Sequence, residues 1–253
     1  MAIDTIETLV ERLVAARTPG APRVTPDTEL PGGHGGAYRV QAGVAARLGP
    51  VGGFKCGRKA PDGVLKLAPV RAAEVRTDGV ELPGSASGLH LVELEVAFRL
   101  FADPPPVDDP RFEALLRERV EVLPALEIVD SRLDDFTAAP EAWQLADDQN
   151  AGGIVLGTRS DGADDAGLVE RDVRLEIGGQ EVHAGPAAFP GGDAFATFAA
   201  FVRTVGAHCG GLRAGQACIT GALTGPHPAR AGDEIRGSID GLGTVGARFA
   251  PDV

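Results

Sequence analysis

The sequence predicts an α+β fold in which a small helical region precedes a larger body made mostly of strands. Apolar residues in the first 50 positions recur at helical spacing, whereas from Val51 onward they form short alternating or continuous runs. Glycine and proline, 35 and 19 of the 253 residues, interrupt those runs at short intervals, as is typical of strands joined by turns.

The helical region is expected over residues 1–50, as a lead-in to a main body over 51–253. Residues 3–17 have the pattern of an amphipathic helix, because Ile6, Val10 and Leu13 fall on one stripe. A loop rich in proline and glycine follows, and a second helix is predicted over 37–48.

The main body is predicted to be strand-rich, with two helices over 110–121 and 192–207. The expected strands cover residues 64–67, 91–100, 124–130, 154–157, 172–177, 217–220, 233–239 and 243–249. Strands with segregated helices are the pattern of an α+β architecture.

The net charge limits the possible partners. Lysine and arginine total 24 residues against 36 aspartates and glutamates, so the formal net charge is −12. Nothing in the sequence supplies the basic stripe that would neutralise the phosphates of a nucleic acid. We therefore expect no nucleic-acid partner.

The cysteines and the N-terminus predict a soluble cytoplasmic protein. Cys56, Cys209 and Cys218 are widely spaced and odd in number, which favours reduced thiols over a disulfide framework or a zinc site. The acidic N-terminus lacks the basic start of a signal peptide. The longest apolar run, residues 195–202, is too short to cross a bilayer, so we expect no membrane association.

Two glutamates share one face of the predicted strand 91–100. Side chains alternate along a strand, so Glu93 and Glu95 point to the face opposite the apolar residues, with their Cα atoms roughly 7 Å apart. Both carboxylates can therefore approach one ion from the same side. Two glutamates on the solvated face of a half-buried strand are also common, and this segment alone is consistent with both interpretations.

Glu127 lies inside an apolar run that reads as a buried strand. Burying an ionised carboxylate is costly unless a cation, a lysine or a proton accompanies it. Three carboxylates that meet without a cation repel by roughly 4 kcal/mol per close pair at an effective dielectric constant of about 20. A divalent ion removes this repulsion, and ligands that are all oxygen favour Mg²⁺ or Mn²⁺ over zinc. The residues alone leave open whether the two strands meet.

Short motifs along most of the chain resemble the 2-keto-4-pentenoate hydratase family, within the fumarylacetoacetate hydrolase superfamily. No single motif is decisive, but their order and spacing are specific. They are Gly53-Phe54-Lys55-Cys56-Gly57, Glu93-Leu94-Glu95-Val96-Ala97-Phe98, the segment ALEIVDSR at 125–132, Ala146-Asp147 with Val155-Leu156-Gly157, Ala214-Gly215, Thr220-Gly221-Ala222-Leu223-Thr224 and Ala231-Gly232-Asp233.

The resemblance implies a mixed β-roll of the fumarylacetoacetate hydrolase C-terminal-domain type with a small N-terminal helical region, assembled as a homo-oligomer. It also implies roles for seven residues. The ligands of Mg²⁺ or Mn²⁺ are Glu93, Glu95 and Glu127. The catalytic residues are Lys55 and Asp62, and the residues that receive the substrate carboxylate are Gly221 and Thr224.

The implied activity is that of a metal-dependent lyase acting on a small 2-oxo or 2-hydroxy-dienoic acid. The leading expectation is a hydratase of a 2-hydroxy-alka-2,4-dienoate, in the meta-cleavage degradation of aromatic compounds. The alternatives are a decarboxylase of a 2-oxo-enedioate such as 4-oxalocrotonate, a hydrolase of an acylpyruvate, and a non-catalytic partner subunit. The resemblance also allows a hetero-complex with a related pathway enzyme.

The segment from Arg58 to Leu65 departs from the family pattern. The family has a longer lid loop over the substrate here, so most of the lid is expected to be deleted. Asp62 corresponds to the lid aspartate only through this shortened loop. Lids exclude water and complete the catalytic geometry. The residues that bind the metal are therefore better predicted than the residues that bind the rest of the substrate.

Overall fold

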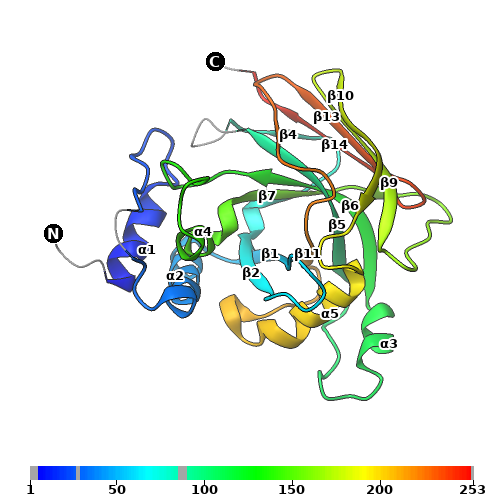
Figure 1. Ribbon diagram of the computed structural model, residues 1–253, viewed down its shortest axis with the longest axis horizontal. Coiled ribbons are helices and arrows are strands. Elements are labelled where there is room, and N and C mark those ends of the chain that lie inside the picture. Colours follow the sequence, from blue (N-terminus) through cyan, green and yellow to red (C-terminus); the bar gives the residue numbers. More distant parts are fainter. Residues whose placement is uncertain (1–4, 27–28, 85–89, 252–253) are drawn as a thin grey trace.

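The computed structural model describes residues 5–26, 29–84 and 90–251, and it confirms the predicted α+β class. Two mixed sheets pack against each other, with α5 beneath them and α1, α2 and α4 at one end of the molecule (Figure 1). The helices are α1 (Ile6–Ala15), α2 (Gly33–Leu48), α3 (Phe112–Arg117), α4 (Glu141–Ala146) and α5 (Ala194–Val205), with 3-10 turns η1 (Ala72–Glu74), η2 (Asp148–Asn150) and η3 (His208–Gly210).

The larger sheet has eight strands, and β1 and β5 carry the lysine motif and the Glu-Leu-Glu motif of the sequence analysis. In spatial order these are β2 (Lys66–Arg71), β1 (Val51–Gly57), β11 (Ala217–Ile219), β5 (Leu91–Leu100), β6 (Val120–Val129), β7 (Ala151–Leu156) and β3 (Val75–Thr77), with β12 (His227–Pro228) also paired to β5. The pairs β1–β11 and β3–β7 are parallel, and the others are antiparallel.

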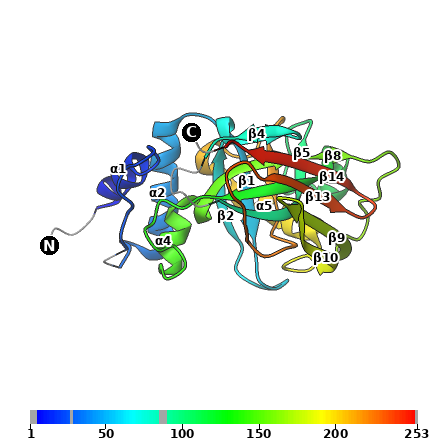
Figure 2. The same ribbon diagram turned by 90° about the horizontal axis from the view of Figure 1, so that it is seen from above.

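The smaller sheet covers one face of β5, β6 and β7 (Figure 2). Its six strands are β10 (Gln180–Ala188), β9 (Glu170–Ile177), β13 (Glu234–Ile239), β14 (Gly243–Phe249) and β4 (Val80–Leu82), with β8 (Thr158–Arg159) paired to β14. None of the helices in the described ranges has both the length and the apolar character needed to cross a membrane.

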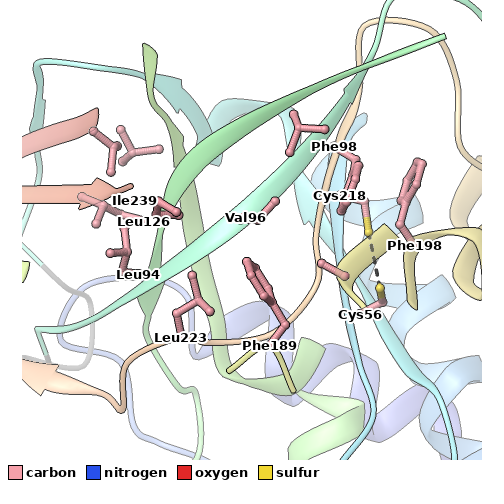
Figure 3. Close-up of a cluster of buried hydrophobic side chains, with 14 of the residues drawn as sticks. Cys56, Leu94, Val96, Phe98, Leu126, Phe189, Phe198, Cys218, Leu223 and Ile239 are labelled. Atoms are coloured by element: carbon pink, nitrogen blue, oxygen red, sulfur yellow. Dashed lines mark hydrogen bonds between the residues drawn. The ribbon is translucent and has the colours of Figure 1, made fainter. Parts of the chain in front are cut away.

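The alternation along β5 positions the metal-site candidates. Leu94, Val96 and Phe98 are fully buried and point into the core between the sheets and α5 (Figure 3). The Phe98 ring stacks on Phe198 of α5, with 4.6 Å between centroids and 7° between ring planes. Because this face of β5 is fixed by packing, Glu93 and Glu95 must point to the other face.

The N-terminal helices have a core of their own. Leu9 and Leu13 of α1 pack with Val40 of α2 and with Trp143 of α4. Thr5 caps α1 by accepting a hydrogen bond from the Thr8 N–H at 3.1 Å. The predicted helix over 3–17 is observed from residue 6 to 15, and residues 3 and 4 lie outside the described part. The division of the chain at residue 50 stays a prediction.

The structure differs from the prediction at one helix and at several strands that were not predicted, among them β1. The helix expected over 110–121 is only 112–117, because β6 begins at Val120 and pairs with β5 along the whole length of both strands. Strand β1 was not predicted, because its glycines obscure any strand pattern. A Cβ on Gly52 would lie 2.5 Å from the Cα of Ala72, so these glycines permit close approach of neighbouring backbone.

Candidate metal centre

The three predicted ligands are brought together by the pairing of β5 with β6. Glu93 lies directly opposite Glu127 in the antiparallel register, and Glu95 lies opposite the small residue Ala125. One carboxylate oxygen from each glutamate lies within 4.8 Å of the others. Glu95 and Glu127 are 2% and 1% exposed, so this is a buried acidic cluster rather than a solvated strand face.

Lys55 reaches the cluster from β1. Its ammonium forms an ion pair with Glu127 and donates a second hydrogen bond, of 3.1 Å, to the backbone oxygen of Gln149. In the sheet order β1 is separated from β6 by β11 and β5. The contact is therefore possible only because the larger sheet curves, which places strands far apart in the order around one centre.

One lysine does not balance three glutamates. Burial raises the pKa of Glu93 to about 7, and the charge of Glu127 adds to this effect while Lys55 opposes it. Burial also raises the pKa of Glu95 well above its usual range, again with the charges of Glu127 and Glu93 adding to it. Burial alone would lower the pKa of Lys55, but the surrounding carboxylates outweigh it and raise that pKa. The cluster needs further positive charge or protons.

The residues fit a divalent cation. Three carboxylates provide an all-oxygen donor set, and their net charge with Lys55 is compensated by one dipositive ion. Hard oxygen ligands of this kind suit Mg²⁺ or Mn²⁺, whereas the sulfur and imidazole ligands that favour zinc are not in the cluster of described residues.

The turn that follows β11 is hydrogen-bonded to β5, the strand that carries Glu93 and Glu95. The Gly221 N–H donates to Glu95 Oε2 at 2.8 Å, and Gly221 has a φ of +114° that favours glycine. The Thr224 hydroxyl oxygen accepts a 3.0 Å hydrogen bond from the Leu94 N–H. Both residues thus adjoin the cluster, and the Gly221 N–H orients Glu95. The substrate-binding roles of Gly221 and Thr224 stay predictions.

Asp62 is not brought into the carboxylate cluster. It is exposed, in the turn between β1 and β2. Arg58 holds this turn in place, because its guanidinium donates to the Pro61 backbone oxygen at 2.5 Å and to Thr197 Oγ1 of α5 at 3.2 Å. The catalytic role of Asp62 stays a prediction.

The segment 148–150 is a part of the site that the sequence analysis missed. Asp148, Gln149 and Asn150 have φ values of 52°, 52° and 60°, which residues other than glycine rarely adopt. This conformation directs the Gln149 carbonyl toward Lys55. Asn and Asp tolerate left-handed backbone better than most residues, but nothing local in the sequence predicts it for Gln149.

Buried ion pairs hold this segment in place. Arg132 Nε donates to Asp147 Oδ1 at 2.5 Å, and Arg17 donates to Asp148 Oδ2 at the same distance. Burial raises the pKa of Asp148 to about 6, although Arg17 and Arg132 both oppose this shift. Such ion pairs over-determine a strained backbone that would not persist alone.

Comparison with known proteins agrees with the motifs. No protein-family model matches the chain. The chain is 29% identical over 174 residues to a 2-hydroxyhexa-2,4-dienoate hydratase of Comamonas testosteroni, a match that covers 68% of this chain and 65% of that protein. It is 33% identical over 137 residues to 2-keto-4-pentenoate hydratase 2 of Dechloromonas aromatica, covering 54% of this chain and 52% of that protein.

Solved structures share the fold. A 4-oxalocrotonate decarboxylase from Pseudomonas putida G7, complexed with magnesium and adipate, matches with a TM-score of 0.75 at 21% identity, over 98% of this chain and 100% of that one. A 2-hydroxyhepta-2,4-diene-1,7-dioate isomerase from Mycobacterium marinum matches with a TM-score of 0.54 at 16% identity, over 80% of this chain and 77% of that one.

The fold and the site thus define an α+β protein that has a buried cluster of three glutamates, one of which is paired with a lysine. The matches confirm the resemblance to the 2-keto-4-pentenoate hydratases, and the solved structures show that the chain shares the fold of the 4-oxalocrotonate decarboxylase. In sequence, the chain spans about half of the length of the keto-pentenoate hydratases and 65% of the hexadienoate hydratase.

Proposed function

We propose that this protein is a metal-dependent lyase that hydrates a 2-hydroxy-alka-2,4-dienoate to a 4-hydroxy-2-oxo acid. The observation that carries the proposal is the buried cluster of Glu93, Glu95 and Glu127, with Lys55 paired to Glu127. The relatives named as a 2-hydroxyhexa-2,4-dienoate hydratase and a 2-keto-4-pentenoate hydratase support the choice of substrate class.

The three glutamates would hold one divalent ion, either Mg²⁺ or Mn²⁺. When bound, the ion supplies positive charge that stabilises negative charge developing on the 2-oxygen of the substrate. The Gly221 N–H keeps Glu95 oriented for this role, and Lys55 does the same for Glu127. Neither glutamate then depends on the substrate for its position.

Lys55 is the group best placed to hold a proton beside the substrate. The surrounding carboxylates raise its pKa and keep Nζ protonated, so it acts as a counter-charge rather than as a general base. A bound divalent ion would offset the charge of those carboxylates and make Nζ a better proton donor. In the net reaction the 2-hydroxyl loses a proton as the carbonyl forms, carbons 5 and 3 each gain a proton, and hydroxide from water adds to carbon 4. Lys55 is proposed to supply one of the carbon-bound protons.

A decarboxylase of a 2-oxo-enedioate is the second candidate. Its support is a 28% identical match over 128 residues to the 4-oxalocrotonate decarboxylase of Pseudomonas putida, which covers 51% of this chain. The same ion and lysine would then stabilise the charge left when a carboxylate departs as CO₂.

Turnover of purified protein distinguishes these candidates. With Mg²⁺ or Mn²⁺ added, 2-hydroxypenta-2,4-dienoate should lose its dienol absorbance and give a product heavier by one water. A decarboxylase would instead release CO₂ from 2-oxohex-3-enedioate. Binding of Mn²⁺ without turnover of either acid, or of an acylpyruvate, would favour a non-catalytic subunit and reject the lyase.

The metal centre itself is tested by Glu127→Gln, with Glu121→Gln as the control. Both glutamates lie on β6 and pair with a cation, but Glu121 is partly exposed and pairs with Arg99. Titration with Mn²⁺ should show loss of binding only for Glu127→Gln. Retained binding and activity in that variant would reject the assignment. A homo-oligomer is proposed from the same resemblance, and light scattering after size-exclusion chromatography measures it.

A further inference from the structure

A second charged cavity lies on the other side of the sheet from the metal centre. It has a volume of about 290 Å³, near the lower end of ordinary ligand pockets of ~300–1,000 Å³. Ile128 lines it, and Ile128 points to the face of β6 opposite that of Glu127. Four arginines and two acids also line it: Arg17, Arg71, Arg76, Arg132, Glu74 and Asp130.

Three of these arginines have donors that the described part of the chain leaves unused. The Nε atoms of Arg17 and Arg71 are buried and have no hydrogen-bond partner among the described residues. The Arg17 side chain is only 8% exposed, so water does not readily reach its Nε atom to accept a hydrogen bond. The Arg76 side chain makes no hydrogen bond or ion pair with the rest of the described chain, although the residue is partly buried and its backbone belongs to β3. Buried donors without acceptors are uncommon in folded proteins and call for a partner.

Among the described residues, no carboxylate accepts a hydrogen bond from the Nε atoms of Arg17 and Arg71. Glu74 pairs with the terminal nitrogens of Arg71 and, at 3.9 Å, of Arg17. Arg132 is fully engaged by Asp147 and by backbone oxygens. Arg76 and the Nε edges of Arg17 and Arg71 therefore remain. Arg17 also pairs with Asp148, and Asp130 lines the cavity, so nearby carboxylates offset much of the positive charge. The unused guanidinium donors are what distinguishes this cavity, on a protein whose net charge is −12.

A bound anion would also stabilise the charged form of the arginine side chains in the cavity. Burial lowers the pKa of Arg17, and the positive charge of Arg132 lowers it further. A guanidinium presents its donors as a planar fork, which matches the oxygens of phosphate and carboxylate groups. We propose that this cavity binds the oxyanion group of a small molecule, phosphate or carboxylate, at a site separate from the metal centre. This binding goes beyond the proposed lyase activity.

Calorimetric titration of the metal-free protein tests the proposal, with inorganic phosphate in one series and acetate in another at constant ionic strength. Wild-type protein should bind one equivalent of at least one anion. Arg76→Gln should weaken that binding about tenfold or more, because a charge-assisted hydrogen bond is lost. Since Arg76 has no partner in the described chain, this variant should keep its melting temperature. Arg111→Gln removes an exposed charge that does not line the cavity, and should bind as wild type does.

The outcomes are distinguishable. Tighter binding of phosphate identifies a phosphate-bearing ligand, and tighter binding of acetate identifies a carboxylic acid. Absence of saturable binding in both series overturns the proposal, as does equal affinity in wild type and Arg76→Gln. The Glu127→Gln variant should bind the anion normally. Loss of binding there would place the anion at the metal centre and overturn the separate site, without bearing on the lyase.

Discussion

The ammonium of Lys55 donates a 3.1 Å hydrogen bond to the backbone carbonyl of Gln149, a residue whose φ is +52°. The same ammonium pairs with Glu127. Lys55 therefore has one partner in the acidic cluster and one in a strained backbone segment outside it. A free lysine side chain samples many rotamers, so two fixed partners reduce the entropy lost when it acts on a substrate.

Replacing Lys55 by methionine should remove most of the activity while leaving the fold in place. Loss of a positioned proton donor typically lowers a rate by about 10²- to 10⁴-fold. Steady-state kinetics on the dienoate measures this, and Lys59→Met, at an exposed position four residues on, is the control. Activity close to that of wild type in Lys55→Met would contradict the role given to Lys55.

Metal-free protein should lose stability as the pH rises from about 4.5 to about 7. The pKa of Glu93 rises from its usual 4.5 to about 7 in the fold, so the folded state holds a proton that the unfolded state releases. The folded carboxyl is thus destabilising once the unfolded one ionises, by roughly 3 kcal/mol above pH 7. Thermal melts across this range should show a falling melting temperature, with a smaller fall in Glu93→Gln.

Mn²⁺ should reverse that trend. The ion competes with the proton on Glu93, so its affinity should increase as the pH rises through about 7. The gain in melting temperature at fixed Mn²⁺ should accordingly be larger at pH 8 than at pH 6. A gain that does not change with pH would mean that Glu93 is not a ligand.

Gly221→Ala should weaken metal binding from outside the ligand set. Its φ of +114° is strained for alanine, and a Cβ there would lie 3.3 Å from Pro190. A shift of this backbone would remove the N–H that orients Glu95. We expect a stability loss of about 1–3 kcal/mol and weaker Mn²⁺ binding. Gly225→Ala is the control, because a Cβ there meets no atom within 4 Å and its φ is not in the strained range.

The position of Glu93 and Glu95 on one face of a strand could be predicted from alternation alone. The reason is that packing of the apolar face, as for Phe98 on Phe198, fixes which face of the strand points into the core. The pairing of Glu93 with Glu127 is a non-local register that no spacing reveals, and only the family resemblance indicated it. The approach of Lys55 depends on curvature of the whole sheet, which the residues near Lys55 do not encode.

The left-handed segment 148–150 was missed for a related reason. Its conformation is maintained by partners distant in the sequence, such as Arg17 for Asp148. Strain of this kind is visible only when the residues that stabilise it are in place. The turn at Gly221 was identified from the resemblance, but its hydrogen bond to Glu95 was not, because the two residues are 126 positions apart in the sequence.

Arg17 lies two residues beyond the end of α1, and its partner Asp148 is next to the residue that holds Lys55. Arg17 thus connects the end of α1 to the segment that holds Lys55, in addition to the packing of α1 and α2 on α4 and the hydrogen bond from Gln41 of α2 to the Leu145 carbonyl. We therefore expect docking of those helices to help fix the position of Lys55. A chain whose first helix has not yet docked would contain all three glutamates and Lys55, but would lack the fixed carbonyl that keeps Lys55 in position.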